Sequence, residues 1–142
     1  MSRIQVGFSQ FKKAFETHWE NGRKETGPSY NLLKFYSVEC GLKSMYIHEN
    51  DRFHRMTSEQ MPADHSHRLD QWIKELNIPA SRISPPPRFR IRQSSRDESP
   101  RDIEKIHEAW RYGVVIEPND ETSILRWLEV VSNWIREGLK EA

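Results

Sequence analysis

The chain has 142 residues, the usual size of one domain, and its formal net charge of +1 excludes a global electrostatic attraction to nucleic acid or membranes. Only 35% of the residues are hydrophobic, but five Trp, six Phe and four Tyr supply enough apolar surface for one core, while a single cysteine excludes an internal disulfide. No run approaches the roughly 18 apolar residues of a membrane helix and the first residues show no secretory signal, so we expect a soluble, cytoplasmic protein.

Two long helices are predicted in the first third of the chain. Aromatic residues recur every three or four positions between residues 8 and 19, which is the helical period, and predict a helix over residues 4–24. A Gly-Pro pair at 27–28 ends this helix, and a second one is predicted over residues 29–49. The second helix is apolar on most sides, which is typical of the buried centre of a bundle. We interpret Cys40, inside this helix, as an unreactive packing thiol.

A loop over residues 50–63 and a shorter helix over residues 64–76 are predicted next. Leu69, Trp72, Ile73 and Leu76 share one stripe of the short helix, and a Pro at 79 limits it. His65 and His67 could hold a metal ion, but two histidines are too few ligands and their spacing suits a loop or a helix cap. We therefore predict no metal site.

Residues 77–99 form a Pro/Arg-rich arm inserted in the single domain that we predict for residues 1–142. Three consecutive prolines at 85–87 forbid a helix, and charged and apolar residues alternate over 88–92, which is the strand period. We expect either a short edge strand or an arm lying on the surface. Between residues 77 and 101 there are six Arg against one Asp and one Glu, so the basic charge is concentrated here.

Two further helices are predicted after the arm. Ser99 as N-cap and Pro100 at the first helical position predict a helix that runs to about residue 112. After a turn at residues 118–120, Asp120 is predicted to cap a last amphipathic helix that continues to about residue 139. The expected fold class is therefore all-α, a bundle of about five helices with an irregular arm.

Arg101 and His107 are the candidate catalytic pair. A histidine can take or give a proton near neutral pH, an arginine can bind a phosphate, and RNA supplies its own nucleophile, the 2′-hydroxyl. A spacing of six residues places the two side chains about 120° apart on a regular helix, so they converge only if the first turn is distorted or two copies meet. The alternative is that Arg101 is a solvated first-turn residue and His107 packs or caps.

Three segments resemble HEPN domains, the higher eukaryote and prokaryote nucleotide-binding superfamily. They are residues 35–43 in the second helix, residues 67–76 in the short helix and residues 106–112 before the last helix, and the resemblance extends in order over about residues 30–139. It implies an all-α bundle that is often dimeric. Many such proteins are metal-independent ribonucleases of bacterial toxin–antitoxin, phage-defence and RNA-processing systems, and they need no cofactor.

The resemblance also implies roles for particular residues. The family motif is an arginine, a polar residue and a histidine after four to six intervening residues, which Arg101 and His107 match with five. Two copies across a dimer would form one composite site. Asp102 stands where active members most often have Asn. The resemblance gives structural positions to Glu39, Lys43, Arg111 and Tyr112, in keeping with an i,i+4 ion pair and an arginine at a helix C-terminus.

Two functions remain open from the sequence. The first is a dimeric, metal-independent endoribonuclease that cuts single-stranded RNA. In it the arginines of the arm contact the RNA backbone and an aromatic ring stacks on a base. The second is a non-catalytic HEPN-like subunit of a larger complex, in which the arm docks on a partner protein or nucleic acid. In either case the predicted binding residues are Arg88, Phe89, Arg90, Arg92 and Arg96.

Overall fold

The computed structural model describes residues 5–62, 65, 67–92 and 99–140. Five α-helices follow in chain order: α1 (Phe8–Gly22), α2 (Pro28–Asn50), α3 (Leu69–Glu75), α4 (Ile106–Arg111) and α5 (Pro118–Lys140). Two short 3₁₀ helices, η1 (Ser58–Gln60) and η3 (Ile103–Lys105), precede α3 and α4. The described residues contain isolated β-bridges but no strand, which confirms the all-α fold class. No helix in this part of the chain is long and apolar enough to span a bilayer.

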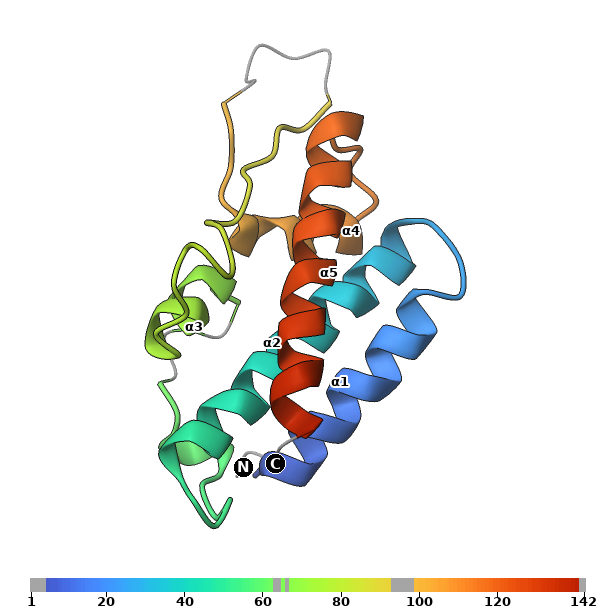
Figure 1. Ribbon diagram of the computed structural model, residues 1–142. Helices are drawn as coiled ribbons and strands as arrows, with labels where there is room; N and C mark the ends of the chain where they lie inside the picture. Colours follow the sequence, from blue (N-terminus) through green and yellow to red (C-terminus); the bar gives the residue numbers. More distant parts are fainter. Residues whose placement is uncertain (1–4, 63–64, 66, 93–98, 141–142) are drawn as a thin grey trace.

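Helix α2 is the centre of the bundle. It packs against α1, α3, α4 and α5, and Figure 1 shows α1 running beside it and α5 crossing in front of it. Phe35, Val38, Leu42 and Ile47 are completely buried, so apolar side chains face several neighbouring helices at once. The two long N-terminal helices begin and end close to the predicted positions, because their apolar periodicity and the Gly-Pro break are local signals.

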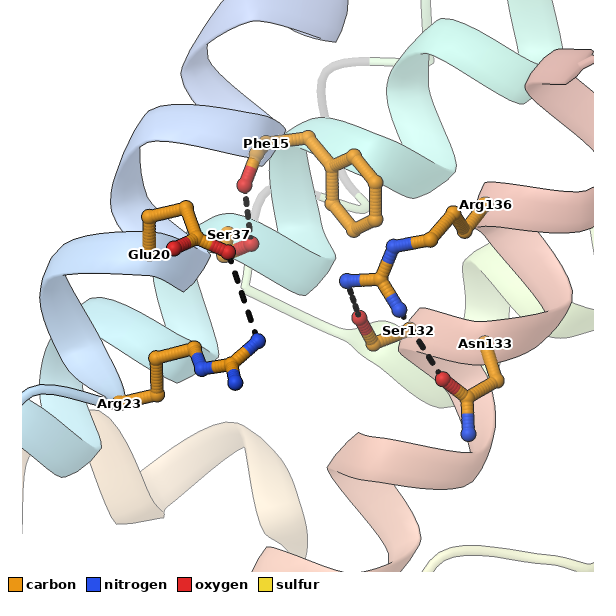
Figure 2. A network of polar contacts seen from close by, with 7 residues as sticks. All are labelled: Phe15, Glu20, Arg23, Ser37, Ser132, Asn133 and Arg136. Carbon is orange, nitrogen blue, oxygen red and sulfur yellow. Dashed lines mark hydrogen bonds and ion pairs between the residues drawn. The ribbon is translucent and has the colours of Figure 1, made fainter.

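A buried hydrogen bond and a close approach fix α1 against α2 and α5. The Ser37 hydroxyl donates to the Phe15 carbonyl oxygen over 2.6 Å, from α2 to α1 (Figure 2). The Arg136 guanidinium bonds Ser132 and Asn133 within α5 and lies 5.8 Å from the centroid of the Phe15 ring. The three helices therefore meet around one phenylalanine.

Gly41 permits this meeting of helices. A Cβ atom at Gly41 would lie 2.7 Å from Cδ1 of Phe15 and 2.8 Å from Cδ1 of Ile135, both shorter than carbon atoms in contact allow. The absence of a side chain at this position lets α1 and α5 approach α2 more closely than any other residue type would.

The arm packs on the bundle through its apolar residues. Phe89 is only 1% exposed, while Arg88, Arg90 and Arg92 are exposed, so the predicted alternation is confirmed. Phe89 forms an antiparallel bridge with Arg101. Two residues further on, Ile91 forms an antiparallel bridge with Ile116 on the other side of the extended segment. The segment over 88–92 is therefore held from both sides, rather than forming the predicted edge strand or a surface arm.

The prediction that a helix starts at Ser99 and Pro100 is wrong. The Arg101 amide donates to the Phe89 carbonyl over 2.7 Å, and the Phe89 amide donates to the Arg101 carbonyl over 3.0 Å. This pairing with a segment 12 residues earlier satisfies the main chain in an extended form and overrides the local helix signal. The helical path begins at Ile103 with η3 and continues as α4.

Two other predicted boundaries differ from the structure. The short helix begins at Leu69, and the predicted start at Asp64 lies outside the described residues. At the start of α5 the carboxylate of Glu117, not that of Asp120, accepts the free amides, those of residues 119 and 120. The carboxylate of Asp120 instead accepts a hydrogen bond of 3.0 Å from the Arg90 amide, and so ties the arm to α5.

Candidate functional site

The two predicted catalytic residues lie on different sides of α4. His107 points from α4 towards α2, where its ring stacks on Phe35 with 5.7 Å between the ring centroids. Arg101 lines a cavity of about 500 Å³ whose described lining does not include His107. Within one chain, the structure therefore does not bring the two residues into one cavity. A composite site across a dimer stays a prediction.

A second histidine lies against His107. The rings of His67 and His107 are 4.3 Å apart between centroids and inclined by 32°. His107 is 7% exposed, and burial, followed by the nearby His67, lowers its pKa from the ordinary value, while the main chain of Glu104 partly offsets this. The neutral form of His107 is thus favoured, because a cation in this place would be poorly solvated and close to a second imidazole.

Glu39 links His67 to α2. The buried carboxylate of Glu39 has one oxygen 3.2 Å from Nδ1 of His67 and the other 3.2 Å from Nζ of Lys43. A carboxylate oxygen accepts hydrogen bonds, so Nδ1 of His67 serves as the donor in this contact. The side chain of His67 is 42% exposed and that of Glu39 only 8%, so the imidazole is the more accessible of the two groups. We call Glu39, His67 and His107 the histidine row.

Arg111 and Tyr36 form a second polar contact between α4 and α2, one helical turn from the histidine row on each helix. Arg111 follows His107 by one helical turn, and its guanidinium donates a hydrogen bond of 2.6 Å to the Tyr36 hydroxyl. Tyr36 precedes Glu39 by one turn on α2. After burial and His67, the charge of Arg111 also contributes to lowering the pKa of His107.

Only part of this arrangement is predictable from the amino-acid sequence. Glu39, Lys43 and Arg111 are predicted as structural residues; in the structure Glu39 contacts Lys43 and His67, and Arg111 lies one turn from His107 on α4. The sequence analysis assigns His67 no role in catalysis, only a rejected metal site and a place in the segment 67–76, and it assigns no role to Tyr36. The contact between Glu39 and His67 joins residues 28 positions apart, so no periodicity or local motif could have revealed it.

The cavity on the opposite side of α4 contains other predicted binding residues. Arg88, Arg101 and Lys105 line it together with Asp102, Glu104 and Glu108, so its charges balance. One pair is in contact, since Nε of Arg88 lies 3.2 Å from a carboxylate oxygen of Asp102. Tyr112, 73% exposed, stands at the rim. We call this cavity the arm cleft.

One of the predicted binding residues, Phe89, is not accessible at the surface. The buried ring of Phe89 belongs to the core, so the prediction that it stacks on a base is wrong for this conformation. Its strand-like alternation directs it inwards, between the exposed side chains of Arg88 and Arg90. Arg96 lies outside the described residues.

Comparisons of the chain with known protein families, curated proteins and solved structures find no match. In the part of the chain that it describes, the structure establishes an all-helical protein. In the described part of the chain, no three His, Cys, Asp or Glu side chains gather as ligands for a metal ion. Membership of the HEPN superfamily stays a prediction from the resemblance.

Proposed function

We propose that this protein is a metal-independent endoribonuclease that cleaves single-stranded RNA at the histidine row. The observation that carries the proposal is the contact of two imidazoles, one bonded to a buried carboxylate and the other with a pKa that burial lowers. Titratable groups whose environments differ in this way are typical of acid–base sites. The resemblance to HEPN domains suggests a toxin–antitoxin or phage-defence setting and a dimer.

In the proposed reaction, His67 exchanges protons with the RNA. Its Nε2 accepts the proton of a 2′-hydroxyl, whose oxygen attacks the adjacent phosphorus, and the 5′ oxygen leaves after taking a proton back from the imidazolium. The products are a 2′,3′-cyclic phosphate and a 5′-hydroxyl. Glu39 holds the ring in one tautomer and stabilises its charged form, and Arg111 supplies positive charge for the phosphate.

His107 acts behind His67 in this proposal. It is too buried to be the first group that meets the RNA, so we assign it the role of a positioning residue that packs against the His67 ring. Arg101 then contributes through the arm cleft, together with Arg88 and Lys105, to contacts with the RNA backbone.

The test is cleavage of end-labelled RNA of mixed sequence in the presence of EDTA. We expect His67→Ala to lose at least about 100-fold in rate, as loss of a general acid–base group requires, whereas His18→Ala on α1 retains the wild-type rate. Wild-type products should carry a cyclic phosphate. Circular dichroism checks that each variant is folded.

Two other results would lead to different conclusions. If Arg101→Ala and His107→Ala abolish cleavage but His67→Ala does not, the composite dimer site is the active one. If the folded wild type cuts no RNA, the second candidate function, a non-catalytic interaction subunit, replaces the first. The observation that favours this second candidate is the separation of Arg101 from His107 by α4 within one chain.

A further inference from the structure

An exposed aromatic side chain stands between two arginines just after α2. Phe53 is 69% exposed. The guanidinium carbons of Arg52 and Arg55 lie 5.8 and 5.3 Å from the centroid of its ring. In the described part of the chain, neither arginine forms an ion pair with a carboxylate. The loop thus presents one aromatic ring and two positive charges to the solvent.

The carboxylate of Asp51 organises this loop. Its two oxygens accept hydrogen bonds from the amides of Phe53, Arg55 and Met56, over 3.1, 2.6 and 2.7 Å. Desolvation alone would raise the pKa of Asp51, but these three bonds and the charge of Arg55 lower it. Three main-chain bonds to one side chain fix the path of the loop, so the ring is displayed in one place.

His54 anchors the loop to the bundle. Its ring stacks on Phe8 of α1 with 3.9 Å between centroids, and its Nε2 lies 2.9 Å from Nδ1 of His48 on α2. The backbone of His54 has a φ of +54°. A residue other than glycine adopts this conformation at a cost in free energy, so the surrounding contacts must maintain it. The loop therefore directs His54 inwards and its neighbour Phe53 outwards.

We propose that the loop over residues 51–56 is a contact site for single-stranded RNA, in which Phe53 stacks on an unpaired base and Arg52 and Arg55 bind the adjacent phosphates. The proposal rests on the proposed function only in taking RNA as the ligand. An aromatic ring flanked by cations suits a single strand, because each nucleotide offers one flat base and one charged phosphate. A ring held on an ordered loop loses little conformational freedom when it binds.

The surroundings of Phe53 favour this ligand over a protein or a bilayer. Its exposed neighbours Arg52 and Arg55 are charged, and the other large exposed apolar residues lie on other segments, at positions 112–115 and 130. One phenyl ring is too small to form the apolar centre of a protein interface or to anchor a chain in lipid. It is large enough to cover one base.

The experiment is a binding titration of the full-length protein with a fluorescein-labelled 2′-O-methyl oligouridine, followed by fluorescence anisotropy in EDTA. This probe lacks the free 2′-hydroxyl and is not cleaved. We expect Phe53→Ala to weaken binding about tenfold, since the stacking of one base on an aromatic ring contributes about this factor to the affinity. Phe53→Trp keeps an aromatic ring and should bind within about threefold of wild type. Val130→Ala, another exposed apolar truncation, is the control and should not change the affinity.

Salt dependence gives a second readout. The double variant Arg52→Gln, Arg55→Gln should lower the slope of log Kd against log salt concentration by about 1.4, which corresponds to two phosphate contacts on a single strand. Equal affinity of Phe53→Ala and wild type for the probe overturns this proposal but leaves the ribonuclease proposal untouched. If the wild type binds the probe through Phe53 but cleaves no RNA, the proposal of the contact site is supported and the ribonuclease proposal is overturned. Binding to phosphatidylserine vesicles through Phe53, without RNA binding, would also overturn the proposal of the contact site.

Discussion

Replacing Gly41 by Ala should destabilise the protein, although alanine is the better helix former. The added Cβ would lie 2.7 Å from Phe15 and 2.8 Å from Ile135, about 1 Å closer than an ordinary contact, and both neighbours are buried. Overpacking of this kind costs about 1–3 kcal/mol, and the gain in helix propensity returns about 1 kcal/mol. The expected net loss in the free energy of unfolding is therefore up to about 2 kcal/mol.

The matched control is Gly138→Ala in α5. Its Cβ would meet only Cε and Sδ of Met45, at 2.6 and 2.9 Å, which are the end of a flexible side chain. Both variants are measured by urea unfolding followed by circular dichroism, with thermal unfolding as a second probe. We expect Gly41→Ala to have a lower midpoint than Gly138→Ala at an equal m-value. If Gly41→Ala is more stable than wild type, as the gain in helix propensity alone would make it, the close approach of α1, α2 and α5 around Gly41 is refuted.

Three further predictions concern polar groups. Ser37→Ala should lower the free energy of unfolding by about 1 kcal/mol, because the hydrogen bond to Phe15 is lost, and a stability unchanged in urea would contradict this. The pKa of His107 is lower in the folded than in the unfolded protein, so the unfolded state binds more protons below pH 6.5 and stability should fall as the pH decreases through that range. The thermal stability of His107→Gln should depend less on pH than that of wild type, and equal slopes of stability against pH would refute this prediction. Asp51→Ala should speed hydrogen exchange at the amides of Phe53 and Met56, whereas unchanged protection would show that the carboxylate does not hold the loop.

The helices were predictable where the signal is local. The aromatic period over residues 8–19, the Gly-Pro break and the apolar run of α2 gave two helices within a few residues of their observed bounds. The same logic failed at Ser99 and Pro100, where the local signal for a helix start was strong. There, main-chain pairing of Arg101 with Phe89 decides the conformation, and such pairing between distant segments leaves no periodic trace in the sequence.

Some residues of the candidate site were predictable from the sequence, but their arrangement in space was not. His107, Glu39 and Arg111 were singled out from their residue types and spacing, but their arrangement depends on how α4 crosses α2. His67 enters through a contact across 28 residues, and Phe53 is distinguished by its exposure, which the sequence does not state. For Phe89 the sequence is misleading. Its place among arginines suggests a surface contact, but its ring lies in the core.

Helix α4 carries residues of both polar sites. Glu108 and Ala109 line the arm cleft, while His107 and Arg111 face α2. Both polar sites therefore depend on the placement of one helix of six residues. A substitution that displaces α4 at one site should disturb the other as well, although none of the described residues that line the arm cleft belongs to the histidine row.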